Sequence, residues 1–324
     1  MRRMSLPNNT GGVSNEMTKP GWINGRAQAA AGSRKYKLWL PPTLDSAKSA
    51  PLLMLLHGCT LNAHAMAEIS GMNAIADANQ FLVVYPEQRR LANMMKCWNW
   101  FDPKHQSRDA GEPSILAAIV EQVRSDFRID PQRIYVAGVS AGGAMAVIAG
   151  AAYPDLFAAI AVCAGGEFKA ASNVSSALAV MKNGGPDPAQ QGEAAFEAMK
   201  PGLAGKMRRR MPVIVFHGAS DMRVDPVNAE QIIAQWSKTN ACLSTQSGDN
   251  GFRLTESITD GRVPEGYSYR KHGYTDQDGR LLMEKWIVEG LGHAWSGSPK
   301  AHRYGDPKGP NASAEIWRFF NEAG

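Results

Sequence analysis

Short apolar segments recur along the chain, and stretches with helical periodicity separate them. The segments are YKLWLPP (36–42), PLLMLLHG (51–58), FLVVYPE (81–87), RIYVAGVS (133–140), FAAIAVCAGG (157–166), PVIVFHG (212–218) and EKWIVEGLGH (284–293). Four of them are nearly continuous in valine, isoleucine, leucine, alanine or methionine, which is typical of strands buried on both faces of a parallel sheet. Strands that alternate with helices predict a single α/β domain, with a mostly parallel, doubly wound sheet flanked by helices.

Three stretches fall outside this alternation. Residues 1–33 are rich in glycine, asparagine, serine and alanine, so we expect a flexible N-terminal arm before a single domain over 34–324. Residues 165–211 contain several glycines and prolines and are predicted to form a cap-like insertion above the sheet. Alternating tyrosines and the turn pair Asp278-Gly279 within 241–283 indicate a hairpin at the sheet edge.

Charge and composition exclude several classes of partner. The net charge is +5, and the one dense basic cluster, residues 206–210, is expected to be a solvated loop. The chain lacks the basic stripe with stacking aromatics that binding of nucleic acid requires. No apolar stretch approaches the ~18 residues of a membrane span, and the N-terminus lacks the apolar core of a secretory signal. The sequence leaves the compartment and the oligomeric state open.

Cysteine usage gives no sign of a metal centre. The four cysteines, Cys59, Cys97, Cys163 and Cys242, have no C-x-x-C spacing and no nearby histidine pair. A structural or catalytic zinc site needs such a set of ligands. We therefore expect no metal and no cofactor.

The segment RIYVAGVSAGGAM places Ser140 in a G-x-S-x-G motif between a predicted strand and a predicted helix. A nucleophilic serine of this kind occupies a strained turn, where neighbouring side chains must be absent. The strand brings the hydroxyl to the carboxyl edge of the sheet, and the helix N-terminus brings free backbone N–H groups and a positive dipole end. Ser140 is the predicted nucleophile.

A serine hydroxyl needs a base, and the base needs an orienting acid. In this type of fold the chain order is serine, then Asp or Glu, then histidine, each in a loop after a later strand. Asp221 follows the strand of PVIVFHG, and His293 follows the last predicted strand. Asp225, further round the same loop, is the alternative acid. The other six histidines are predicted to be structural or on the surface: His57, His64, His105, His217, His272 and His302.

The tetrahedral intermediate would also need an oxyanion hole. One donor is predicted to be the backbone N–H of Ala141, directly after the nucleophile. The other is expected from the loop after LLMLLHGCT, at the N–H of Cys59. The predicted activity is therefore hydrolysis of a carboxylic ester through an acyl-enzyme.

At this point the chain resembles a known family. The segments LLHGCT, YPEQ, CWNWF, GVSAGGAM, FHGASDMRVDPVN and GLGHAWSG together are similar to the poly(3-hydroxybutyrate) depolymerase-type esterases, relatives of feruloyl esterases in the α/β-hydrolase superfamily. The resemblance implies an α/β-hydrolase fold, a triad of Ser140, Asp221 and His293, and an oxyanion hole at Cys59 and Ala141. It implies activity on 3-hydroxybutyrate oligomers, other polyhydroxyalkanoate-type esters or short-chain esters.

Two departures from the family qualify this implication. The chain shows no appended polymer-binding domain, which favours oligomers or small esters over crystalline polymer. It also shows no export signal, although relatives are often secreted. A feruloyl or acetyl esterase acting on plant polysaccharide esters is the alternative within the class. An acyltransferase, or a binding module with a decayed site, are the alternatives outside it.

Residues near the predicted site complete the hypothesis. Trp295, two residues after His293, is expected to form an apolar wall for the acyl chain, and Trp98 and Trp100 to do so from the other side. Cys59 and Cys97 lie in segments that should approach the site. We hypothesise that a disulfide between them fixes the oxyanion loop, with two free thiols as the alternative.

Overall fold

The protein is described by a computed structural model over residues 21–204, 209–249 and 251–323. These residues form a sheet of ten strands in the order β1-β2-β4-β3-β5-β6-β7-β10-β9-β8. The strands are β1 (Gly21–Ala29), β2 (Gly32–Leu40), β3 (Ala50–Leu56), β4 (Leu82–Pro86), β5 (Ile129–Val139), β6 (Ile160–Cys163), β7 (Val213–Gly218), β8 (Thr255–Arg262), β9 (Ser268–Thr275) and β10 (Leu281–Val288). All seven strands predicted from the apolar segments are among them.

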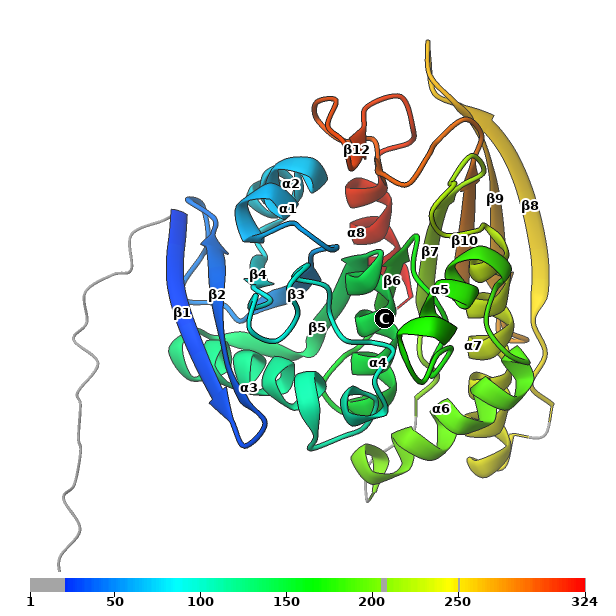
Figure 1. Ribbon diagram of the computed structural model, residues 1–324, viewed down its shortest axis with the longest axis horizontal. Helices are drawn as coiled ribbons and strands as arrows, with labels where there is room; N and C mark the ends of the chain where they lie inside the picture. The colour runs from blue at the N-terminus through cyan, green and yellow to red at the C-terminus, as the bar shows by residue number, and fades with distance from the viewer. Residues whose placement is uncertain (1–20, 205–208, 250, 324) are drawn as a thin grey trace, which may run out of the picture.

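The centre of the sheet is parallel and its two edges are antiparallel. Strands β4, β3, β5, β6, β7 and β10 run in the same direction. Figure 1 shows the antiparallel strands β1 and β2 at one edge and β9 and β8 at the other. The turn at Asp278-Gly279 joins β9 to β10, so the predicted hairpin is confirmed, but β8 and not this hairpin forms the edge of the sheet.

Helices cover both faces of the sheet. They are α1 (Ala63–Ser70), α2 (Met72–Asn79), α3 (Gly111–Asp126), α4 (Ala141–Ala152), α5 (Val174–Asn183), α6 (Pro188–Leu203), α7 (Val227–Gln246) and α8 (Ala312–Glu322); a short 3₁₀ helix, η1 (Pro103–His105), and a small pair, β11 (Trp295–Ser296) and β12 (Gly305–Asp306), complete the set. One apolar cluster includes residues of α3, α4, α6 and α7, and the other includes residues of α1, α2 and α8.

Strand β3 shows why the apolar segments are continuous. Leu52, Met54 and Leu56 belong to the first cluster, while Leu53 and Leu55 belong to the second, and all five are fully buried. Successive side chains of a strand point to opposite faces, so a strand covered on both sides must be apolar at every position. The predicted doubly wound architecture is confirmed.

The expected N-terminal arm is wrong for residues 21–33. These residues form β1 and the start of β2, and Trp22 packs edge-on against Trp39 at 5.3 Å between ring centroids. Residues 1–20 lie outside the described part of the chain. The glycine in this segment suggested a flexible arm, but Gly25 lies opposite Tyr36 in the pair of β1 and β2. A Cβ at Gly25 would overlap with the tyrosine ring, so the glycine makes room for that ring. A glycine shielded by a cross-strand aromatic ring is compatible with an edge strand.

The predicted insertion, residues 165–211, contains α5 and α6, and only α5 lies over the candidate site. Helix α6 instead packs against α7 and α4, as part of the helical layer. The basic cluster at 206–210 falls partly outside the described residues. Its last member, Arg210, forms ion pairs with Asp249 and Asp276. None of the helices in the described ranges is both long and apolar enough to cross a membrane.

Candidate active site

Ser140 occupies a strained turn between β5 and α4. Its backbone has φ 57° and ψ −123°, outside the regions that side chains favour, and its N–H donates to the Cys163 carbonyl at 2.8 Å. A Cβ on Gly138 would overlap with the Gly142 backbone, and one on Gly142 would overlap with the carbonyl oxygens of Leu56 and His57. The close approach of neighbouring backbone therefore requires glycine at both outer positions of the motif. Strain of this kind costs about 1–3 kcal/mol and is commonly found at functional sites.

Asp221 and His293 form a hydrogen-bonded pair. His293 Nδ1 lies 2.7 Å from Asp221 Oδ2, and the other carboxylate oxygen accepts the backbone N–H groups of Arg223 and Val224 at 2.8 and 3.0 Å. Asp221 follows β7 and His293 follows β10, so both lie at the same sheet edge as Ser140. Burial alone raises the pKa of Asp221, but these hydrogen bonds and the charge of His293 outweigh it and hold the pKa below its usual value.

Asp225, the alternative acid, serves a different role. It is exposed, and its Oδ1 accepts the backbone N–H of Val227 at 2.9 Å, at the start of α7. Its side chain contacts no histidine in the hydrogen bonds of the described residues. The geometry therefore favours Asp221 as the partner of His293.

Within the described residues, no hydrogen bond joins the Ser140 hydroxyl to His293. Because Asp221 engages Nδ1, Nε2 is the imidazole nitrogen left to act on a serine proton. Such contacts are often long in unliganded sites and tighten when substrate binds. The structure thus assembles the acid and the imidazole and places Ser140 on the same edge of the sheet.

Two backbone N–H groups near Ser140 have no acceptor among the described residues. They belong to Ala141, the first residue of α4, and to Cys59. The segment before Cys59 lies beside the turn, because a Cβ on Gly58 would be 3.5 Å from the Ser140 Cβ. Free N–H groups beside a serine are the groups that an oxyanion would require.

A disulfide and a buried polar network hold the loop that carries Cys59. Cys59 and Cys97 are bonded, so the hypothesis of a disulfide rather than free thiols is confirmed. His57 donates from Nδ1 to the Gly58 carbonyl at 2.7 Å and accepts the Gln88 N–H at Nε2 at 3.1 Å. Gln88 in turn bonds the Cys97 carbonyl and the buried Glu112. The disulfide at Cys59 and the hydrogen bonds of His57 therefore both hold this loop in place.

The pKa of His57 gives a testable consequence for stability. Burial lowers this pKa to about 4, whereas the unfolded residue titrates near 6.5. Below pH 6.5 the unfolded chain therefore binds a proton that the folded chain rejects, and stability falls as the pH falls. Between pH 7.5 and pH 5.0 this group should cost about 2 kcal/mol. Urea unfolding at both pH values should show a loss of stability in the wild type that exceeds the loss in His57→Gln by about this amount.

The exposed His64 provides the control for this measurement. The His64→Gln variant should lose as much stability between the two pH values as the wild type. An equal loss in His57→Gln would show that His57 does not carry the effect.

Two of the three tryptophans predicted to contact substrate do not line the site. Trp295 is fully buried in the cluster under α8, and its Nε1 donates to Ser313 Oγ at 3.1 Å. Trp98 is also fully buried, and its Nε1 donates to the His57 carbonyl at 3.1 Å, so it supports the loop that carries Cys59. Of the three, Trp100 alone lines the pocket beside Ser140. Each indole N–H needs a partner when buried, and these partners set the ring positions.

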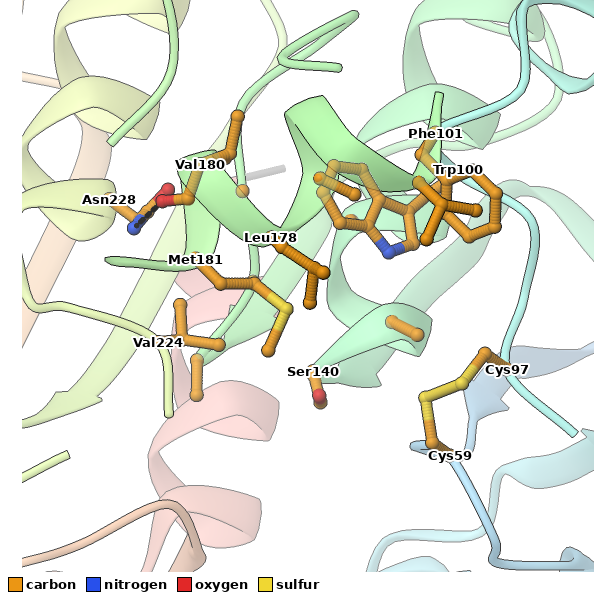
Figure 2. Close-up of a pocket in the computed structure, with 17 residues that line it drawn as sticks. Cys59, Cys97, Trp100, Phe101, Ser140, Leu178, Val180, Met181, Val224 and Asn228 are labelled. Carbon is orange, nitrogen blue, oxygen red and sulfur yellow. Dashed lines mark hydrogen bonds between the residues drawn. A yellow bond between two sulfur atoms is a disulfide. The ribbon is translucent and has the colours of Figure 1, made fainter. Parts of the chain in front are cut away.

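A largely apolar pocket of about 170 Å³ adjoins Ser140. Figure 2 shows the Cys59–Cys97 disulfide on one side of it and Met181 and Val224 on the other. Sequence reasoning missed Val224 and the wall from α5, which is formed by Val174, Ala177, Leu178, Val180 and Met181. Val174, Leu178 and Met181 recur at helical spacing, a signal that the interpretation of 165–211 as an insertion left unused.

Comparison with known proteins finds esterases among the relatives of this chain. Residues 34–256 match the family described as esterase PHB depolymerase. The chain is 34% identical over 246 residues to the poly(3-hydroxyalkanoate) depolymerase C of Paucimonas lemoignei, covering 76% of this chain and 55% of that protein. It is 27% identical over 259 residues to the feruloyl esterase B of Thermothelomyces thermophilus, covering 79% and 82%. This chain thus spans little more than half of the depolymerase.

A solved structure supports the fold. The acetyl xylan esterase from Aspergillus awamori superposes with a TM-score of 0.65 at 18% identity, over 90% of this chain and 94% of that one. At this identity the likeness concerns the fold alone. The α/β-hydrolase fold implied by the sequence resemblance is confirmed.

Proposed function

The chain belongs to the esterase PHB depolymerase family, and on this premise we propose that it is a serine esterase that cleaves carboxylic esters through an acyl-enzyme. The observation that carries the proposal is the hydrogen-bonded pair of Asp221 and His293 on the sheet edge that also presents Ser140 in its strained turn. A nucleophile, a base and an orienting acid are the groups that ester cleavage without a cofactor requires.

In the first half-reaction, Ser140 Oγ attacks the ester carbonyl while His293 Nε2 takes the hydroxyl proton. Asp221 remains ionised, because its pKa lies below the usual value, and it stabilises the imidazolium that forms. The N–H groups of Cys59 and Ala141 bind the oxyanion of the tetrahedral intermediate. Collapse of this intermediate expels the alcohol, which receives the proton from His293.

In the second half-reaction, His293 removes a proton from water, which attacks the acyl-enzyme. A second tetrahedral intermediate forms and uses the same oxyanion hole. Its collapse releases the carboxylic acid and returns the proton to Ser140. The disulfide and His57 keep the Cys59 N–H in place through both steps, so the hole is preorganised before substrate arrives.

The proposed substrates are 3-hydroxybutyrate oligomers or related short-chain hydroxyalkanoate esters. The apolar pocket beside Ser140 suits an acyl chain of modest size, and the similar Paucimonas protein is a poly(3-hydroxyalkanoate) depolymerase. Feruloyl esters are the second candidate, because Trp100 and Phe101 in the pocket wall could stack on an aromatic acyl group.

A direct comparison of esters tests the proposal. The kcat/KM for acid release should be highest on a 3-hydroxybutyrate trimer, measured beside methyl ferulate and an acetylated xylo-oligosaccharide. Release from the ferulate or acetyl ester, with none from the trimer, would keep the esterase but replace its substrate. A transfer product that outweighs free acid, when an alcohol acceptor is added, would indicate an acyltransferase. No reaction with any ester would contradict the proposal.

A further inference from the structure

Asn228, in the first turn of α7, presents a fixed amide to the pocket wall. The side chain is fully buried, and its Nδ2 donates to the carbonyl oxygens of Val180 at 3.1 Å and Asp225 at 3.0 Å. Two carbonyl acceptors can be satisfied only by the NH₂ group, so the opposite orientation of the amide is excluded. Figure 2 shows the bond to Val180 as a dashed line.

The Oδ1 atom of Asn228 is an unpaired acceptor. It is buried and has no hydrogen-bond partner among the described residues. Asn228 lines the pocket together with apolar neighbours such as Val180, Met181 and Val224. A buried acceptor in an apolar wall is costly unless a donor reaches it, so such a group needs an explanation.

This acceptor lies away from the nucleophile. A Cβ on Gly166 would be 3.8 Å from Asn228 Oδ1, and Gly166 stands three residues beyond Cys163, whose carbonyl binds the Ser140 N–H. In the view of Figure 2, Met181 lies between Asn228 and Ser140. An acyl group bonded to Ser140 would therefore meet Asn228 with its far end and not beside its carbonyl.

We propose that Asn228 Oδ1 accepts a hydrogen bond from a hydroxyl group at the far end of the substrate acyl chain, and so selects hydroxyl-bearing acyl groups. The inference rests on the proposed function, because it assumes that the acyl chain occupies this pocket. Two sources share this chemistry: the terminal hydroxyl of a hydroxyalkanoate oligomer and the phenolic hydroxyl of a hydroxycinnamoyl group. A site that binds a hydroxyl rejects the analogue without it, because its polar group is then left unpaired.

Two pairs of methyl esters test the proposal on the wild-type enzyme. The first pair is the 3-hydroxybutyrate dimer and the same dimer with a butyryl group in place of its hydroxyl-bearing end. The second is methyl 4-hydroxycinnamate and methyl cinnamate. Methanol release, quantified by product analysis separately from cleavage of the internal ester of the dimers, should show a kcat/KM about 10- to 100-fold higher for the hydroxylated member of one pair. The pair that shows the preference identifies the source of the hydroxyl.

Variants assign the preference to Asn228. In Asn228→Leu the ratio within the preferred pair should fall to about 1, because the acceptor is gone. Asn240→Leu is the matched control, since Asn240 is also fully buried on α7 but has both amide groups bonded to Met211. Its ratio should stay at the wild-type value. If the leucine variant does not fold, Asn228→Ala replaces it.

The possible outcomes distinguish a failure of the role proposed for Asn228 from a failure of the proposed esterase function. Hydrolysis of p-nitrophenyl butyrate, with ratios near 1 in both ester pairs, would overturn the role of Asn228 and leave the esterase intact. An unchanged ratio in Asn228→Leu would do the same. Failure to hydrolyse p-nitrophenyl butyrate or any of the methyl esters would overturn the proposed function, and the inference would fall with it.

Discussion

The Ser140→Ala variant is expected to lose about 10⁶-fold in kcat on any ester that the wild type hydrolyses. Removal of Oγ eliminates the acyl-enzyme, so His293 and Asp221 have no nucleophile to activate. The N–H groups of Cys59 and Ala141 remain and can still polarise a bound ester, which leaves a residual rate about 10³- to 10⁴-fold above that of the uncatalysed reaction. Initial rates on the 3-hydroxybutyrate trimer measure the loss.

Ser220 provides the control for this variant. It is exposed and immediately precedes Asp221 in the same loop, so Ser220→Ala should retain activity within about threefold of the wild type, as an ordinary surface substitution does. A Ser140→Ala variant that is folded and keeps a tenth or more of the wild-type kcat would remove Ser140 from the mechanism.

The Asp221→Asn variant is expected to lose about 10⁴-fold in kcat near neutral pH. The substitution replaces the carboxylate that faces His293 Nδ1 with a neutral amide, which no longer selects the tautomer with a free Nε2 acceptor. The amide also no longer offsets the positive charge that the imidazole acquires. The KM should change much less, because Asp221 is buried and bonded to His293 and to its own loop.

Asp225→Asn separates the two acidic residues of this loop. The Asp225 carboxylate accepts only the Val227 N–H at the start of α7 among the hydrogen bonds of the described residues. The variant should therefore keep kcat within about threefold and lose about 1 kcal/mol of stability at most. If Asp225→Asn were the inactive variant and Asp221→Asn the active one, the pairing with His293 described above would not be the functional one.

The sequence was most informative for residues whose place follows from the direction of the strand that precedes them. Ser140, Asp221 and His293 follow three strands whose apolar runs mark them as parallel and buried. Because the carboxyl ends of parallel strands meet at one edge, residues far apart in the chain could be assigned to one site without a structure. Gly138 and Gly142 were also informative in the sequence alone, because contact with neighbouring backbone leaves no room for a side chain at either position.

Side-chain direction was the point at which that reasoning failed. Trp295 follows His293 by two residues, yet its indole turns into the core because Ser313, on α8, supplies the partner for its N–H. Trp98 likewise depends on the carbonyl of His57, a residue in a distant loop. Such partners are distant in sequence, and no local pattern in the chain predicts them. The pocket wall from α5 was missed for a different reason: Val174, Leu178 and Met181 recur at helical spacing, but that spacing does not show which site the apolar face of the helix covers.

The most direct test of the central claim is labelling with a fluorophosphonate probe followed by mass mapping of the modified peptide. One adduct is expected, on Ser140, that disappears in Ser140→Ala and forms far more slowly in Asp221→Asn. An adduct on a different serine, or no adduct on an enzyme that hydrolyses esters, would contradict the assignment of Ser140 as the nucleophile.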